Sequence, residues 1–140
     1  RNISAGSICR QTTIPEGKLL ISPLVEFHLK DDSKDDPLLT YDRMKLMGYD
    51  AEEFIGPALK INKVLIKVFH NIGLDLVDFK VEFGVDSKGN LLLADEISPD
   101  SCRLWKTGTQ QSMDKDLFRN DEGDIIEPYK IILKKLQETN

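Results

Sequence analysis

Two acidic residues, Glu82 and Asp95, lie on neighbouring segments of this sequence whose pattern is typical of a β-hairpin. Residues 76–86 and 91–97 are rich in apolar and β-branched side chains, and the turn-forming residues 87–90 lie between them. With the turn at 87–90, Glu82 is expected directly opposite Asp95, with Cβ atoms about 4.5–5.5 Å apart. Two carboxylates at that distance repel each other by roughly 3 kcal/mol at an effective dielectric constant of about 20. A nearby cation should therefore offset the repulsion.

Two kinds of cation could provide this compensation. One is Mg²⁺, which in phosphoryl-transfer sites is typically held by one or two carboxylates together with substrate phosphates. The other is a lysine, because Lys80 lies on the same face of the predicted strand as Glu82 and could neutralise it at the surface. The spacing leaves both open. The inference also depends on register, since a shift of one residue would move Asp95 to the opposite face.

A third group with chemical potential follows the predicted hairpin. Residues 98–105 are polar and rich in turn formers, and they leave the second strand at the end where Asp95 lies. Arg103 in this segment could hold a phosphate or a carboxylate through its planar guanidinium. An ordinary surface ion pair explains Arg103 equally well at this stage.

The elements that must position these groups are of both kinds. Residues 24–30 alternate between apolar and polar side chains, which predicts a half-buried strand. An acidic loop, residues 31–37, follows it. The strands are therefore combined with helical segments, and we predict an α+β fold in which the antiparallel hairpin 76–97 packs against helices.

Helical periodicity marks the middle and the end of the chain. Asp50 and Glu53 have the spacing of a capping box at a helix start. Gly56-Pro57 is expected to interrupt that helix, and a second helix to run from Pro57 to Gly73. Its apolar stripe comprises Ala58, Ile61, Leu65, Val68 and Ile72. The stripe of a C-terminal helix comprises Ile125, Tyr129, Ile132, Leu133 and Leu136.

The composition is that of one acidic globular domain of 140 residues. Asp and Glu number 24 against 19 Lys and Arg, a net charge of −5, which argues against a general nucleic-acid-binding protein. No apolar run approaches the ~20 residues of a membrane span, and residues 1–7 lack the apolar region of a signal peptide. Cys9 and Cys102 stand far apart and form no Cys-x-x-Cys pair and no zinc spacing, so we expect free thiols and a cytoplasmic protein.

Five blocks of residues carry a resemblance to a known family. They are Arg1-Asn2-Ile3-Ser4-Ala5-Gly6-Ser7 and residues 25–37, 76–84, 93–105 and 113–119. In this order they strongly resemble the SAICAR synthetase family of purine biosynthesis, over nearly the whole chain. That family joins L-aspartate to the carboxyl group of the ribotide CAIR and splits ATP to ADP and phosphate. The resemblance implies the fold of the family's C-terminal lobe, and a phosphorylated carboxylate that the amine of aspartate attacks.

The resemblance also implies roles at the nucleotide and metal. Glu82 and Asp95 would be the Mg²⁺ ligands, in agreement with the predicted register. Lys30 would contact the nucleotide. Asp78 and Lys80 would line the catalytic site, where Lys80 could stabilise the charge of the transferred phosphoryl group. No general base is evident, and positioning with charge neutralisation would suffice for the reaction.

The substrates would be held by a second set of residues. Those that match positions for the ribotide phosphate are Arg1, Ser7 and Arg103. The cationic candidates for the carboxylates of aspartate are Lys115 and Arg119, and Asp36 is a further substrate-binding candidate.

The sequence departs from the family in three places. The family's chain begins upstream with a β-rich lobe that carries a glycine-rich phosphate loop and most of the adenine pocket. We therefore expect residues 1–140 to be the C-terminal substrate and metal lobe without the ATP lobe, and to be inactive alone. Lys106 follows Trp105 where the family has Asp, and Gly56-Pro57 lies where the family has a longer helix.

The leading hypothesis is thus an ATP-dependent carbon–nitrogen ligase that uses CAIR, L-aspartate and ATP with Mg²⁺. The same carboxylate pair would also serve a kinase-like phosphotransferase that acts on another small ribotide. A third possibility is a non-catalytic domain that binds a ribotide or Mg²⁺. Neither nucleic acid nor a membrane is expected as a partner, and a homo-oligomer is left open.

Overall fold

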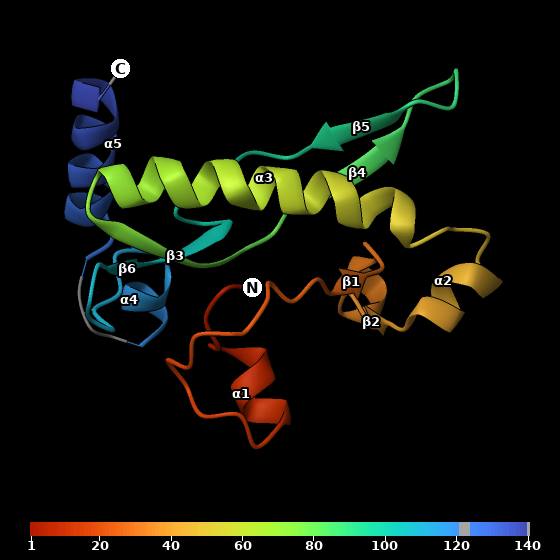
Figure 1. The fold of residues 1–140 in the computed structure, drawn as a ribbon, viewed down its shortest axis with the longest axis horizontal. Coiled ribbons are helices and arrows are strands. Elements are labelled where there is room, and N and C mark those ends of the chain that lie inside the picture. Colours follow the sequence, from red (N-terminus) through yellow and green to blue (C-terminus); the bar gives the residue numbers. More distant parts are fainter. Residues whose placement is uncertain (121–123, 140) are drawn as a thin grey trace.

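A long central helix organises the fold, with short strands and helices around it. The computed structural model describes residues 1–120 and 124–139, and Figure 1 shows their arrangement. The helices are α1 (Ser7–Gln11), η1 (Asp32–Lys34, a 3-10 turn), α2 (Tyr41–Leu46), α3 (Glu52–Asn71), α4 (Asp116–Arg119) and α5 (Ile126–Thr139). The strands are β1 (Phe27–His28), β2 (Leu38–Leu39), β3 (Leu74–Phe79), β4 (Glu82–Val85), β5 (Leu91–Ala94) and β6 (Cys102–Lys106).

The strands form three antiparallel pairs, β1 with β2, β3 with β6, and β4 with β5. The predicted α+β class is confirmed. The strand expected over 24–30 is reduced to the two residues of β1. The strand expected over 76–86 is divided at Lys80, whose backbone N–H donates to the carbonyl of Ser101 at 2.8 Å. The hairpin predicted over 76–97 is therefore limited to β4 and β5.

Strand β6 overlaps residues 98–105, for which the sequence predicts only a turn-rich connection. The turn ends at Ser101, and the apolar side chains that follow it are buried against the core. β6 pairs with β3 in a register that shifts between Leu76 and Asp78. This bulge skips Val77 and puts Asp78 opposite Arg103, so a backbone irregularity brings two predicted site residues together.

The β4–β5 hairpin has a register one residue away from the predicted one. Glu82 faces Ala94, whereas the prediction placed it opposite Asp95. The reason is the loop, which begins one residue earlier than expected. The Asp86 side chain accepts a hydrogen bond from the Asn90 N–H at 2.8 Å, and the Asp86 N–H donates to the Asn90 carbonyl at 3.0 Å. Asp86 thus belongs to the loop, which shifts every pair behind it by one residue.

Helix α3 is continuous over 20 residues, so the predicted interruption at Gly56-Pro57 is wrong. Pro57 lies in the second turn, where its missing N–H leaves the carbonyl of Glu53 without a helical donor. Glu53 is exposed, so water can bind that carbonyl. The predicted end at Gly73 is confirmed. Gly73 has φ +78°, a conformation that glycine adopts without a steric penalty.

The main core lies between α3, β3, β6 and α5. Its buried residues are Phe69, Ile72, Leu74, Leu76, Cys102, Leu104 and Ile132. The predicted apolar stripes are correct at Ile72 and Ile132, which are buried in this core, but wrong at Val68 and Leu133, which are 38% and 57% exposed. The sheet packs on the face of α3 that carries Phe69, so Val68 lies on the rim of that face.

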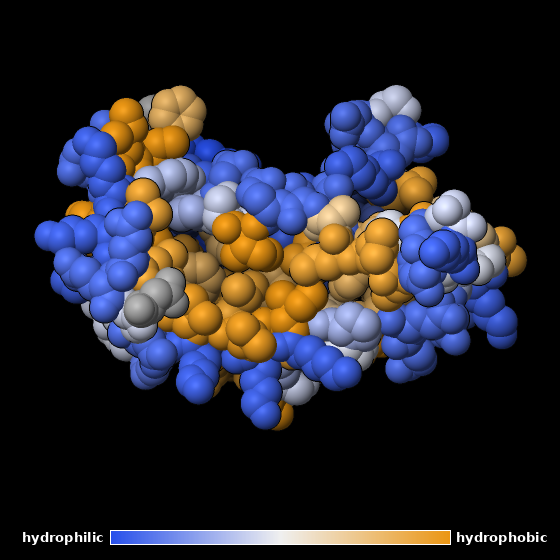
Figure 2. All heavy atoms as spheres, turned by 90° about the horizontal axis from the view of Figure 1, so that it is seen from above, coloured by the Kyte–Doolittle hydropathy of each residue, from blue (hydrophilic) through white to orange (hydrophobic). Residues whose placement is uncertain are grey.

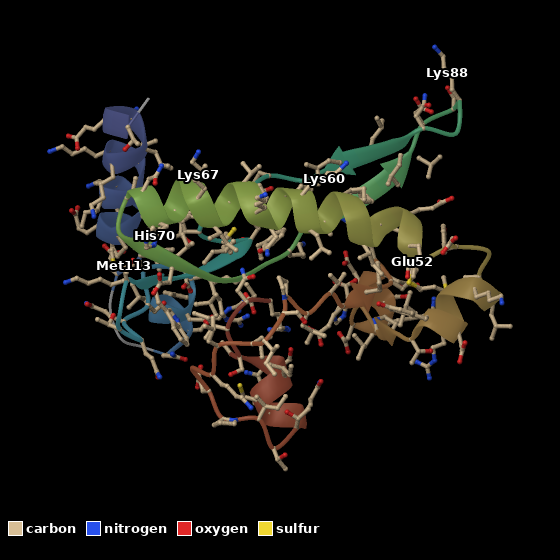
Figure 3. The ribbon with its side chains drawn as sticks, in the orientation of Figure 1. Glu52, Lys60, Lys67, His70, Lys88 and Met113 are labelled. Atoms are coloured by element: carbon tan, nitrogen blue, oxygen red, sulfur yellow. The ribbon has the colours of Figure 1, made fainter. Side chains whose placement is uncertain are left out.

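The face of α3 that is turned away from β3 is exposed. Figure 3 shows Lys60 and Lys67 on this helix, whereas Met113 lies on the β6 side and packs against the core. Figure 2 shows a broad apolar area between polar rims on the upper face. The exposed large apolar residues of α3 and the hairpin are Leu59, Val64, Ile66, Val68, Val85, Leu92 and Leu93. No helix in the described ranges is long and apolar enough to cross a membrane.

Candidate functional site

One cavity of about 780 Å³ gathers charged side chains from distant parts of the chain. The N-terminal segment, β1, α3, β3, β4 and β6 all contribute to its wall. Its charged lining residues are Arg1, Glu26, Lys30, Asp36, Asp78, Lys80, Glu82, Arg103 and Lys115. A volume of this size is typical of sites for small molecules. Most of the residues predicted from the sequence therefore meet in one place.

Aromatic side chains form an apolar wall of the cavity. Phe54, in the first turn of α3, makes edge-to-face contacts with Phe27, Tyr49 and Phe83, with ring centroids 6.2, 6.4 and 5.7 Å away. These contacts join the first turn of α3 to β1 and β4. The Cys102 thiol also lines the cavity, but burial raises its pKa to about 11, so it stays protonated at neutral pH.

The first charged cluster consists of two arginines that share one carboxylate. Asp78, which is 7% exposed, accepts hydrogen bonds from Arg1 Nη1 at 2.5 Å and from Arg103 Nη1 at 3.0 Å. Burial lowers the pKa of Arg103, but attraction to Asp78 and the hydrogen bond to Asp116 outweigh burial and raise it overall. These hydrogen bonds hold both guanidiniums in fixed orientations.

Two further carboxylates hold the outer edges of these guanidiniums. Glu26 accepts a hydrogen bond from Arg1 Nε, and Asp116 accepts one from Arg103 Nε at 2.6 Å. Neither residue was among the predicted site residues. The available signals were weak, since Glu26 lies on the polar side of the alternation over 24–30 and Asp116 stands next to a candidate lysine.

The arginines also contact the segment that precedes α1. Arg1 Nη2 donates to Ser7 Oγ at 2.8 Å, so Ser7 belongs to this cluster. Gly6 has φ +65°, and a Cβ at this residue would lie 2.7 Å from Arg103 Nη2. Only glycine lets the guanidinium approach the backbone this closely. Arg103 Nη2 donates to no described residue, so its N–H groups remain available to an anionic ligand.

The second charged cluster joins Glu82 and Asp95 through lysines. Lys30 Nζ lies 2.5 Å from Glu82 Oε2, and Lys80 Nζ lies 3.2 Å from Glu82 Oε1 and 3.4 Å from Asp95 Oδ2. Asp95 follows β5 with φ +76°, a left-handed conformation that aspartate tolerates better than most residues. This turn of the backbone, and not cross-strand pairing, brings Asp95 to the ammonium group that also contacts Glu82.

Hydrogen bonds lower the pKa of both carboxylates. The hydrogen bond from Lys30, followed by that from Lys80, lowers the pKa of Glu82. Hydrogen bonding with Glu96 is the main cause of a lowered pKa at Asp95, to which Lys80 adds. Lysine, one of the two kinds of cation considered from the sequence, therefore contacts both carboxylates. Two ionised carboxylates that converge on one cation are also a donor set that suits Mg²⁺, which takes one or two carboxylates with phosphates and water.

The remaining predicted residues differ in their position. Asp36 lines the cavity, and its carboxylate accepts the Asp31 N–H at 2.8 Å. Lys115 lines it too and donates to the carbonyl of Asp100. Arg119 is outside the lining and pairs with Asp116 at 3.4 Å, so its link to the cavity runs through that residue. Among the described residues no group of three or more His, Cys, Asp or Glu is placed to hold a metal.

The fold and the site define an α+β protein with a small-molecule cavity lined by two arginines and Glu82, while Asp95, outside the lining, contacts the same Lys80 as Glu82. The family model for SAICAR synthetase matches residues 1–136, and the chain belongs to this family. It is 55% identical to the phosphoribosylaminoimidazole-succinocarboxamide synthase of Prochlorococcus marinus, over 97% of this chain and 60% of the relative. The corresponding Pyrococcus furiosus enzyme is 47% identical, over 97% of this chain and 59% of the relative.

Solved structures give the same result. A structure described as SAICAR synthetase (Type-2) in complex with ADP superimposes with a TM-score of 0.89 and 45% identity, over 97% of this chain and 60% of the other. SAICAR synthetase from Pyrococcus horikoshii OT3 gives a TM-score of 0.89 and 43% identity, over 99% and 62%. The chain therefore spans about 60% of the length of the relatives that it matches.

Proposed function

We propose that the protein is an ATP-dependent ligase that joins L-aspartate to the carboxylate of CAIR, giving SAICAR, ADP and phosphate in de novo purine biosynthesis. The observation that carries this proposal is the meeting of two charge clusters in one cavity of about 780 Å³. The relatives named as synthases of SAICAR add to it. In this proposal residues 1–140 form one C-terminal lobe for substrate and metal, and the family's nucleotide lobe is a separate part.

The arginine cluster is proposed as the site of the ribotide phosphate. Arg1 and Arg103 present fixed, charged guanidiniums, and Ser7 adds a hydroxyl at 2.8 Å from Arg1 Nη2. Asp78 accepts hydrogen bonds from both guanidiniums and would hold them in place for the phosphate. Because planar guanidiniums bind phosphate oxygens in pairs of hydrogen bonds, this arrangement fixes orientation as well as position.

The carboxylate cluster is proposed as the site of phosphoryl transfer. Mg²⁺ held by Glu82 and Asp95 would neutralise charge on the phosphates of ATP. Lys30 and Lys80 carry the positive charge that a transferred phosphoryl group requires, and their raised pKa values keep them protonated. The CAIR carboxylate would accept the phosphoryl group, and the amine of aspartate would then form the new C–N bond as phosphate leaves.

Binding of aspartate completes the proposal. Lys115 lies at the cavity and is the better placed of the two cationic candidates, and Arg119 would act after a change of partner from Asp116. Asp36 would contact the amine. The location is proposed to be the cytoplasm, which the free thiols of Cys9 and Cys102 support.

The test is product analysis with a protein that includes residues 1–140 and has the full length of the relatives. CAIR, aspartate and ATP–Mg²⁺ should yield ADP and SAICAR, detected by mass spectrometry. Asp95→Asn should lower kcat by roughly 100-fold, because it replaces a charged ligand of Mg²⁺ with a neutral one and so weakens the cation that neutralises the phosphates. Asp86→Asn, in the turn of the same hairpin, is the matched control and should retain activity.

Three results would contradict the proposal. Full activity of Asp95→Asn would show that Asp95 is not a ligand of Mg²⁺. If the assay without aspartate accumulates a stable phosphorylated product, the protein would instead be a kinase-like phosphotransferase. Binding of CAIR with no formation of ADP by the full-length protein would favour a non-catalytic ribotide-binding domain.

A further inference from the structure

We propose that Asn62, in the middle of α3, is a positioning residue that acts through Asn2 to orient the guanidinium of Arg1. The inference rests on the proposed function only in taking Arg1 as a phosphate ligand. It assigns part of the substrate site to a helix that carries none of the predicted site residues.

The observation is a reciprocal pair of amide hydrogen bonds. Asn2 Nδ2 donates to Asn62 Oδ1 at 2.8 Å, and Asn62 Nδ2 donates to Asn2 Oδ1 at 2.9 Å. Asn2 Nδ2 also donates to the carbonyl of Leu76 at 3.1 Å. Each amide thus uses both a donor and an acceptor, and the pair connects α3, β3 and the N-terminal segment.

The surroundings make this pair costly to break. Asn62 is 6% exposed, and its partner Asn2 also contacts the carbonyl of Leu76 in β3. A buried amide that loses its partner pays the full cost of desolvation, so each asparagine requires the other. Asn62 also lines the cavity itself, as do Arg1 and Asp78.

The backbone transmits this contact to Arg1. The Asn2 N–H donates to the carbonyl of Val77 at 2.7 Å, and the Arg1 carbonyl accepts the Leu24 N–H at 2.9 Å. Val77, which is fully buried, is the residue skipped by the bulge that places Asp78. Asn62 therefore braces the point from which both Arg1 and Asp78 extend into the cavity.

The test compares four variants of the protein at the full length of its relatives. Asn62→Leu keeps the size of the side chain but removes both hydrogen bonds. It should raise the KM for CAIR roughly tenfold, because Arg1 loses its orientation, with kcat and the KM for ATP nearly unchanged. Calorimetry with ribose 5-phosphate should show a similar loss of affinity. In Asn62→Ser the side chain is too short to reach Asn2, so this variant should show the same rise in KM. It keeps the test informative if the leucine variant fails to fold.

Two reference variants separate positioning from general stability. Phe69→Leu weakens the core on the same helix, away from the cavity, and should lower Tm without a change in the KM for CAIR. Arg1→Gln should weaken binding of ribose 5-phosphate directly. If both Asn62 variants lower Tm as Phe69→Leu does but leave KM and phosphate affinity at the wild-type values, the positioning role is wrong. If Arg1→Gln also leaves phosphate affinity unchanged, the phosphate site itself is wrong, and the role of Asn62 fails with it.

Discussion

Charge balance around Glu82 depends on two lysines that come from different parts of the chain. Lys30 and Lys80 both contact this carboxylate, and Lys80 also contacts Asp95. Because hydrogen bonds from the lysines lower the pKa of Glu82, the contribution of these pairs to stability is present above the ordinary pKa of a glutamate. It is lost as the pH falls through the lowered pKa of the folded state.

Replacing Lys30 tests this balance at the residue scale. Lys30→Met removes the largest cause of the shift, so the pKa of Glu82 should rise toward its ordinary value, as measured by NMR titration of the side-chain carboxyl carbons. Lys34→Met is the matched control, because Lys34 pairs with Asp31 and lowers the pKa of that carboxyl instead. An unchanged Glu82 titration in Lys30→Met would show that the lysine does not set this pKa.

At the scale of elements, α3 is the structural link between the core and the cavity. Its last turns bury Phe69 and Ile72, its middle holds Asn62, and its first turn supplies Phe54 to the cavity wall. The helix keeps this length in spite of Pro57, because contacts at both of its ends offset the missing hydrogen bond.

A pair of proline substitutions measures that cost. Pro57→Ala restores an N–H that can bond to the carbonyl of Glu53, so it should raise the free energy of unfolding by roughly 1–3 kcal/mol. Pro128 lies in the first turn of α5, where a backbone N–H has no acceptor within the helix. Pro128→Ala should therefore change stability by less than about 0.5 kcal/mol. Urea denaturation measures both, and equal gains in the two variants would contradict the explanation.

At the scale of the whole molecule, stability is expected to be uneven. β3 and β6 lie in the main core with α3 and α5, whereas the β4–β5 hairpin extends from it (Figure 1). Val85, Leu92 and Leu93 of the hairpin are 61%, 50% and 51% exposed. A segment with so little burial opens at a low cost in free energy.

Amide hydrogen exchange should therefore separate the two pairs of strands. Backbone amides of β3 and β6 should exchange slowest, through global unfolding, and those of β4 and β5 should exchange faster through local opening. Mass spectrometry of the deuterated protein measures this directly. Addition of Mg²⁺ should slow exchange in β4 and β5 alone, if Glu82 and Asp95 hold it. Equal protection of both pairs would show that the hairpin is part of the core.

Local signals in the sequence were sufficient for several features. Apolar periodicity and turn residues predicted the α+β class, the β4–β5 hairpin and the end of α3 at Gly73. These features depend on residues close together in the chain. The five ordered blocks were sufficient for the family, which the family model confirms over residues 1–136.

Tertiary structure decided how the site is assembled. The hairpin register is the exception, because it is set locally by a hydrogen bond between Asp86 and Asn90 in the loop. Asp95 meets Lys80 because the backbone at Asp95 adopts a left-handed conformation. Glu26 and Asn62 became visible only when distant segments met in space. The sequence by itself determined which chemical groups are available. Only the fold decided which of them share a cavity, because such contacts join residues far apart in the chain and no local pattern encodes them.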